Sequence, residues 1–319
     1  MINVLPYNPE MKLQWDGFIH SSRNSTLLHL RDYMDYHSDR FQDASAVFTD
    51  SRNKIIAVMP ANIGNADKRQ IISHQGLTYG GLVVSPDIHA DTIGEIYSSA
   101  IDYYRHEFKA EELIVKPIPQ IYSSMPCEEE LYFIHRLYGK LIRRNLSQAI
   151  CLDTPHKKNS LRRRCVNKAI KAGLSVVEAT DRLHWNDFHG ILSEVLSKRH
   201  GVTPVHTADE LWRLHSLFPG NIKLYIATLG NDIQAGSIVY YSKNVAHTQY
   251  LASSDHGRDY GALDLVINHI MQSLETTTCK YLDFGISNES DGSLNYGLAL
   301  QKEGFGARGV CYDTYSLKL

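Results

Sequence analysis

A strand that leads through a short turn into an amphipathic helix constrains the fold of this chain more than any other stretch. Residues 244–274 read NVAHTQYLASSDHGRDYGALDLVINHIMQSL. The first part alternates in side-chain character, which is typical of a strand, and the second part carries apolar residues at helical spacing. That helical face comprises Leu263, Val266, Ile267, Ile270 and Leu274. The pattern predicts an α/β protein in which this strand and this helix are successive elements.

The turn between the strand and the helix has a composition suited to binding phosphate. Residues 254–262 read SDHGRDYGA and include Gly257, Arg258, Gly261 and Ala262. A glycine-containing turn that opens a helix exposes unpaired backbone N–H groups at the positive end of the helix dipole. The same residue types also occur in turns that only cap a helix, so both interpretations stay open.

The length of the chain, 319 residues, fits two domains of about 150 residues each. We expect one domain at residues 1–150 and a second at residues 151–319. A hydrophobic fraction of 43% with 21% charged residues indicates a globular protein with a substantial core. Because the net charge is only −2, any site for a nucleic acid or another anion must be a local patch.

Several classes of protein are disfavoured by what the sequence lacks. The five cysteines form no C-x-x-C pair, and the sixteen histidines include no H-E-x-x-H motif, so we expect neither disulfides nor a metal. The N-terminal residues do not resemble a signal peptide, and no apolar run is long enough to cross a membrane. We expect a cytoplasmic protein that neither inserts into a membrane nor binds DNA.

The order of predicted elements occurs twice along the chain. The first half predicts a helix near residues 24–37, strands at 44–48, 54–63 and 71–84, a helix at 88–108, a strand at 112–119, a helix at 128–138 and a strand at 140–152. The second half repeats this order, from a basic helix at 161–172 to a strand at 309–316. The duplication predicts two similar α/β domains, each with a mixed sheet.

Several segments of the second half resemble known acyltransferases. The order meander, loop, helix, strand, helix, strand resembles the GNAT superfamily, and Arg258-x-x-Gly261-x-Leu263 resembles its (Gln/Arg)-x-x-Gly-x-(Gly/Ala) pyrophosphate loop, with Leu263 in place of a small residue. The duplication resembles the Fem-type aminoacyltransferases of peptidoglycan bridges and their FemAB-like relatives. This likeness rests on SLRRRCVNKAIKAGLSVV, NIKLYIATLGNDIQAGSIVYY and QKEGFGA in the second half, and on Tyr79-Gly80-Gly81 in the first.

The resemblance implies two tandem GNAT-like domains, a degenerate first one on the acceptor side and a second one with the donor loop. The implied activity is transfer of an acyl group from acetyl-CoA or another acyl-CoA to an amine on a sugar, peptide or cell-envelope precursor, held in a cleft between the domains. One alternative keeps the fold and uses aminoacyl-tRNA as the donor. Another is a non-catalytic binding protein.

Acyl transfer to an amine needs a base, stabilisation of the developing negative charge and a proton for the leaving group. Strand alternation predicts that His247, Gln249 and Leu251 share one face, so that His247 and Gln249 point together into a cleft. His247 could relay a proton, or it could be a histidine bonded within the sheet. Asp283 ends the next central strand, where ligands bind in open α/β sheets, or it bonds a neighbouring group instead.

Further candidates follow on the segment after Asp283 and elsewhere in the chain. We expect Glu289 as a second possible base, Tyr296 as the acid for the leaving group and Lys302 as an anion contact. The resemblance places the cofactor against Gln249, Gly257, Arg258, Gly261 and Ala262. It also makes Tyr79 a candidate for substrate binding.

Residues 156–168, HKKNSLRRRCVNK, form the most basic run of the chain. Such a run is usually a solvated helix face. In a chain of nearly neutral charge it could also bind the phosphates of coenzyme A, a nucleotide sugar or the acceptor stem of a tRNA, with Arg162 and Arg163 as contacts. The run contains no aromatic residues, which argues against stacking on single-stranded RNA.

Overall fold

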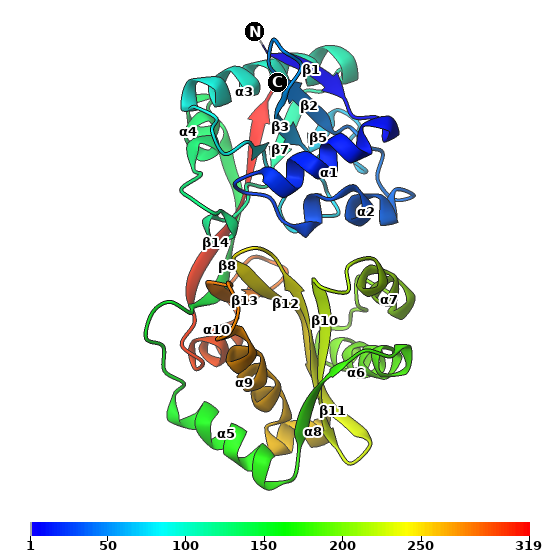
Figure 1. The fold of residues 1–319 in the computed structure, drawn as a ribbon, viewed down its shortest axis with the longest axis vertical. Coiled ribbons are helices and arrows are strands. Elements are labelled where there is room, and N and C mark those ends of the chain that lie inside the picture. Colours follow the sequence, from blue (N-terminus) through cyan, green and yellow to red (C-terminus); the bar gives the residue numbers. More distant parts are fainter. Residues whose placement is uncertain (1) are drawn as a thin grey trace. The chain divides into compact units, whose positions relative to one another are not determined.

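The computed structural model describes residues 2–319, and the side chains of all of these except Arg199 and His200. The chain forms two compact units (Figure 1). The first unit runs to Leu146 and takes in Ser290–Gly292 and Cys311–Leu319, and the second comprises Ser147–Glu289 and Ser293–Val310. The last strand of the chain therefore ends in the first unit, which a single division near residue 150 does not anticipate.

The first unit contains short strands and four helices. Its strands are β1 (Asn3–Pro6), β2 (Ala46–Thr49), β3 (Ile55–Met59), β4 (Asn62–Ile63), β5 (Gln70–Ile72), β6 (Val83–Val84) and β7 (Glu112–Val115), and its helices are α1 (Lys12–Ser21), α2 (Arg31–Met34), α3 (Ala90–Phe108) and α4 (Glu129–Arg136). Strands β1, β2, β3 and β6 form a four-stranded sheet in the order β1-β2-β3-β6. Strands β4, β5 and β7 belong to a second, larger sheet. The apolar face of α3, which includes Ile96 and Tyr104, packs into the core of this unit.

Two predictions for the first unit are wrong in detail. The helix expected near residues 24–37 is broken, because Thr26 caps a single 3-10 turn at Leu27–His29 and the backbone at Leu30 is extended before α2 begins. The strand expected at residues 71–84 is interrupted by a loop between β5 and β6. The N–H groups of Gly80 and Gly81 both donate to the Lys116 carbonyl there. A Cβ on Gly80 would lie 2.2 Å from the Ser73 carbonyl oxygen, so Gly80 permits a close approach of backbone to backbone.

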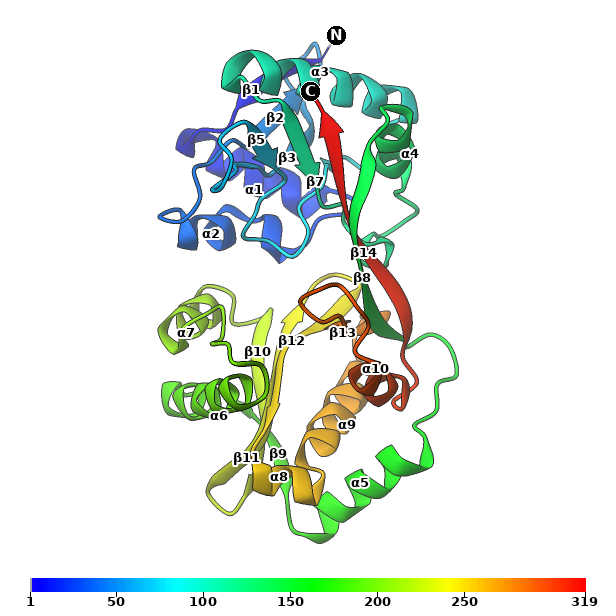
Figure 2. The same cartoon turned by 180° about the vertical axis from the view of Figure 1, so that it is seen from behind.

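The second unit has a larger sheet with helices on both faces. Its elements are α5 (Ser160–Lys171), β9 (Ser175–Ala179), α6 (Arg182–His200), α7 (Ala208–Leu217), β10 (Ile222–Leu229), β11 (Asp232–Tyr241), β12 (Val245–Ser253), α8 (Asp255–Tyr260), α9 (Ala262–Leu274), β13 (Tyr281–Ile286) and α10 (Tyr296–Glu303). Two strands, β8 (Lys140–Cys151) and β14 (Arg308–Lys318), each have residues in both units. These strands belong to a ten-stranded sheet with the order β4-β5-β7-β14-β8-β13-β12-β11-β10-β9. Figure 2 shows α6 and α7 on one side of β10–β12 and α9 on the other.

The helices of the second unit follow from capping residues and apolar faces. The Asn159 side chain accepts the Arg162 N–H at the start of α5, and Thr207 and Glu210 form a capping box at the start of α7. The apolar face of α9, including Val266 and Ile270, is buried in a core cluster against the sheet. The amphipathic pattern that predicted this helix is therefore confirmed.

The two central strands of the second unit pair over only part of their length. β12 and β13 run parallel and pair at three positions, the last of which is His247 with Asp283. β12 then continues to Ser253 beside β11, without pairing to β13 beyond this point. Pairing therefore ends at His247 and Asp283, and the ends of strands are a common position for ligands in open α/β sheets.

Candidate active site

His247 on β12 and Asp283 on β13 form a hydrogen-bonded pair where these strands stop pairing. The His247 Nδ1 lies 2.7 Å from Asp283 Oδ2. The other carboxylate oxygen, Oδ1, accepts a hydrogen bond of 2.5 Å from the Ser147 hydroxyl on β8. Asp283 is fully buried, whereas 15% of the His247 side chain is exposed. A buried carboxylate thus orients an imidazole that reaches the surface.

The bond to Asp283 determines which ring nitrogen of His247 can accept a proton. Because the carboxylate accepts from Nδ1–H, Nε2 carries the lone pair of the neutral ring. Gly285 lies beside that edge of the ring, and a Cβ built on it would lie 3.3 Å from Cε1 of His247. Its φ of +74° also favours glycine. The glycine therefore leaves space next to the nitrogen that would meet a substrate proton.

A β-bulge in β12 changes which side chains share a face with His247. Ile238 pairs with Tyr250 and Val239 pairs with Thr248, so Gln249 has no partner on β11. Leu251 therefore leaves the expected face of His247, whereas Gln249 lies at the bulge with its side chain bonded to Tyr250. Leu251 packs with the core cluster against α9, and Tyr250 moves to the face of His247. Gln249 stays partly exposed at the bulge.

Lys302 on α10 is buried and bonded to the protein. Its Nζ donates to the carbonyl oxygens of Gly285 and Ile286 at 2.7 and 2.9 Å, and to the Ser287 hydroxyl at 2.7 Å. Burial lowers the pKa of this ammonium to about 8, and nearby Asp283 raises it. Since an ammonium has three donors and all are used, the expected contact of Lys302 with an anion finds no free donor here.

Glu289 and Tyr296 lie on the segment that follows β13. The Glu289 carboxylate accepts a hydrogen bond of 2.6 Å from the Asn295 side chain. Tyr296 is the first residue of α10, and 74% of its side chain is exposed. Their roles as base and acid stay predictions.

The expected donor loop is a short helix. Ser254 caps α8, and its side chain accepts the Gly257 N–H. A Cβ on Gly257 would lie 2.2 Å from the Gln234 carbonyl oxygen, so this glycine permits a close approach of β11. Arg258 pairs with Asp255 and donates to the Ser253 carbonyl. Each of these contacts is made within the protein.

The start of α9 already holds a negative charge of its own. Gly261 and Ala262 are buried there, and a Cβ on Gly261 would lie 2.7 Å from the Cys165 carbonyl oxygen of α5. Arg162 donates to both oxygens of Asp264, at 2.8 and 3.1 Å. Burial raises the pKa of Asp264, and the Arg162 guanidinium lowers it. A buried ion pair thus stands in the first turn of α9, and the roles of Gly257, Arg258, Gly261 and Ala262 as cofactor contacts stay predictions.

A comparison with protein families identifies the type of domain in the second unit. Residues 157–296 match the family model described as an acetyltransferase (GNAT) domain. The second unit contains a GNAT domain. The resemblance to GNAT acyltransferases that the sequence predicted is therefore confirmed for this domain, and the protein is an acyltransferase. No sequence among curated proteins matches the chain.

Solved structures share the fold over the whole chain at low sequence identity. FemX is 13% identical, with a TM-score of 0.71 over 99% of this chain and 97% of its own. L-PGS from Bacillus licheniformis is 14% identical, with a TM-score of 0.62 over 98% and 92%. A tandem GNAT protein from the clavulanic acid biosynthesis pathway is 10% identical, with a TM-score of 0.53 over 100% and 98%. These likenesses confirm the α/β fold with two GNAT-like domains.

The basic run at the start of the GNAT domain separates into internal and external charges. Arg162 faces inward to Asp264 and lies 5.7 Å from the centre of the Phe305 ring. Arg163 and Arg164 are exposed on α5, as are Lys168 and Lys171. Only the exposed cations are free to meet a large anion without breaking a buried ion pair.

Tyr79, expected to bind substrate, lies in the core of the first unit. Only 4% of it is exposed, its hydroxyl donates to Thr26 at 3.3 Å, and its ring lies 4.6 Å from that of Tyr122. A substrate contact at this position would require the side chain to leave its packing.

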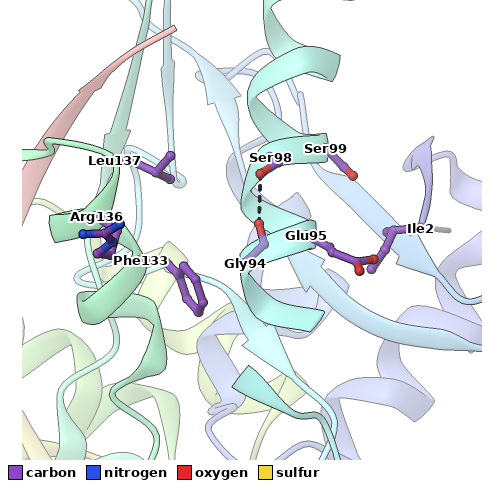
Figure 3. A pocket seen from close by; sticks show the side chains of 8 residues that line it. All are labelled: Ile2, Gly94, Glu95, Ser98, Ser99, Phe133, Arg136 and Leu137. Atoms are coloured by element: carbon purple, nitrogen blue, oxygen red, sulfur yellow. Dashed lines mark hydrogen bonds between the residues drawn. The ribbon is translucent and has the colours of Figure 1, made fainter. Parts of the chain in front are cut away.

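The first unit also has a groove between α3 and α4, with a volume of about 560 Å³. Figure 3 shows Phe133 and Arg136 of α4 on one side of Ser98 of α3, with Glu95 pointing the other way, toward Ile2. None of the residues expected from the sequence lines this groove. Within residues 2–319, no group of His, Cys, Asp or Glu side chains is arranged to hold a metal, and no helix is long and apolar enough to span a bilayer.

Sequence reasoning missed the polar residues that support the histidine. Ser147 bonds Asp283, and Gln148 accepts a hydrogen bond of 2.6 Å from Ser287, which in turn contacts Lys302. Ser147 and Gln148 are fully buried on β8. Two adjacent polar residues inside a strand that ends in Ala-Ile-Cys were the available signal, because buried polar groups require partners.

Proposed function

We propose that the GNAT domain transfers an acyl group from a thioester or ester donor to an amine, with His247 as the general base. The observation that carries this proposal is the buried Asp283 carboxylate bonded to Nδ1 of a partly exposed histidine. That bond holds the tautomer in which Nε2 accepts a proton, and it stabilises the imidazolium that results. The amine nitrogen attacks the acyl carbon while its proton moves to Nε2.

Two donor classes are compatible with this chemistry. Acyl-CoA, such as acetyl-CoA, is the donor that a GNAT domain implies. Aminoacyl-tRNA is the second candidate, and it is favoured by the pair of Arg162 with Asp264, which occupies the start of α9. The exposed cations of α5 offer an alternative contact for the phosphates of a nucleic acid.

For the acceptor we propose an amine on a sugar, a peptide or a cell-envelope precursor, bound on the side of the first unit. Glu289 and Tyr296 stay candidates for a second base and for the acid that protonates the leaving group. The five cysteines are all free thiols, which supports a cytoplasmic location.

The donor can be tested with variants of α5. If α5 binds tRNA, replacing Arg163 and Arg164 together by Ala should weaken binding of aminoacyl-tRNA. The slope of log Kd against log salt concentration should also fall, by the amount expected for the loss of about two phosphate contacts. The matched change Arg162→Ala should instead lower the free energy of unfolding by about 3 kcal/mol, because Asp264 loses its partner. Filter binding at several salt concentrations and urea denaturation measure the two effects.

The donor experiment also separates the competing functions. Tight binding of acetyl-CoA with no binding of aminoacyl-tRNA would restore acyl-CoA as the donor. Mass spectrometry of reactions with each donor and a set of amines then tests transfer itself. Absence of any acylated amine with both donors would leave the chain a non-catalytic binding protein.

A further inference from the structure

A second pair of titratable side chains lies on the His247 face of β12 and has no role in the proposal above. The His206 Nδ1 and the Tyr250 hydroxyl oxygen lie 2.7 Å apart, and their rings are 5.8 Å apart in an edge-to-face arrangement. We propose that Tyr250 protonates the leaving group of the acyl donor and that His206 positions its hydroxyl. This inference rests on the acyl transfer proposed for the GNAT domain.

The bulge at Gln249 brings Tyr250 onto the same face as His247. Tyr250 pairs with Ile238, and His247 pairs with Tyr240, two residues further along β11. Because paired residues point to one side of a sheet, the two side chains lie about 7 Å apart along β12. That spacing suits a base and an acid acting on opposite sides of one acyl carbon. Without the bulge, Tyr250 would point into the core under α9.

The surroundings of Tyr250 keep its hydroxyl fixed and protonated. His206 is 6% exposed, and its carbonyl oxygen accepts a hydrogen bond of 3.0 Å from Nε2 of His189 on α6. Burial raises the pKa of Tyr250 above its ordinary value. The Gln249 side chain and the backbone of Val205 and His206 also bond this hydroxyl, and each lowers its pKa, as a donor to the oxygen does. With His206 Nδ1–H donating to the same oxygen, the phenolic proton can point at a ligand. Tyr296, by contrast, is largely exposed.

The bonds and protons of the reaction balance with these groups. The amine nitrogen forms a bond to the acyl carbon, and the bond from that carbon to the donor sulfur or oxygen breaks. His247 Nε2 takes one proton from the amine, and the departing sulfur or oxygen takes the Tyr250 proton. The tyrosine oxygen is stabilised by His206 Nδ1–H until a proton returns through solvent. The products are an amide and a neutral thiol or alcohol.

The test compares two thioester donors whose leaving thiolates differ in how strongly they depend on protonation by an acid. An alkyl thiolate is a stronger base than an aryl thiolate and therefore gains more from protonation as it leaves. We would measure acetyl transfer to glucosamine from S-acetyl-N-acetylcysteamine and from S-phenyl thioacetate. Tyr250→Phe should slow the alkyl donor by about 100-fold and leave the aryl donor nearly unchanged. His206→Gln should show the same selectivity, with a smaller loss.

Tyr241→Phe is the matched control, because Tyr241 also lies on the sheet but its hydroxyl bonds Tyr225 at 2.9 Å. It should leave both rates unchanged. Equal losses with both donors in Tyr250→Phe would overturn the inference, and so would a selective loss in Tyr296→Phe alone. Wild-type transfer that disappears in His247→Gln supports the proposed function independently of Tyr250. A wild type that acylates no amine from either donor would overturn both.

Discussion

Two buried carboxylates in this protein serve different purposes. Asp283 accepts hydrogen bonds from His247 and Ser147 and orients a group that reaches the surface. Glu130 in the first unit accepts from the Leu82 N–H and the Tyr97 hydroxyl, both at 2.7 Å, and stays inside the core. The partner of each carboxylate, rather than burial alone, separates a candidate for chemistry from a structural group.

Glu130 should make the stability of the first unit depend on pH. Burial raises its pKa from 4.5 to about 7. Because the folded state holds this proton more tightly, the stabilising contribution is complete below pH 4.5 and is lost as pH rises through 7. Glu130→Gln keeps an acceptor oxygen and cannot ionise. Between pH 5 and pH 8, wild type should lose about 2–3 kcal/mol of unfolding free energy relative to this variant.

Urea denaturation of both proteins at the two pH values measures this difference. Other titrating groups are common to wild type and Glu130→Gln, so their effects cancel in the comparison. An unfolding free energy that differs by the same amount at pH 5 and pH 8 would show that Glu130 ionises normally in the folded protein.

At the scale of elements, two local features of the second unit could not be foreseen from the residues. Alternation along β12 placed Gln249 with His247, but a bulge depends on register with β11, which the sequence of one strand does not contain. The residues after Ser253 looked like an open loop because of Gly257, yet they form α8 with Ser254 as the cap. A residue larger than glycine would not fit at position 257, because the backbone of β11 passes next to it.

Gly261 tests whether the turn before α9 is structural. Its φ of +77° costs a residue with a side chain about 1–2 kcal/mol, and an added Cβ would meet Cys165 of α5 at 2.7 Å. Gly261→Ala should therefore lower the unfolding free energy by at least about 2 kcal/mol while the folded variant binds its donor normally. Thermal and urea denaturation, with donor titration below the melting transition, measure both.

A matched control for this change is Gly190→Ala. Gly190 is exposed within α6, where a Cβ would meet nothing within 4 Å, so this variant should gain about 0.5–1 kcal/mol. A Gly261→Ala protein of wild-type stability that has lost donor binding would instead support a phosphate site at the turn.

At the scale of the whole molecule, the duplicated order of elements predicted the fold class, and the GNAT match and the shared folds confirm it. His247 and Asp283 could each be predicted as a candidate on one of two central strands, whereas their hydrogen bond depends on the register of β12 with β13. The return of β14 to the first unit could not be predicted, since its residues carry the same pattern in either unit. Arg162 likewise looked like its exposed neighbours, although Asp264 pairs with it.

The central claim is that His247, oriented by Asp283, removes the proton of the attacking amine. The most direct measurement is kcat/KM for amine acylation from pH 5 to pH 9 in wild type, His247→Gln and Asp283→Asn. We expect His247→Gln to lower the rate by about 100- to 10,000-fold and to abolish its fall at low pH. Asp283→Asn should cause a loss of similar size, because the ring then favours the wrong tautomer. Rates within a few-fold of wild type in both variants, with an unchanged pH profile, would contradict the account.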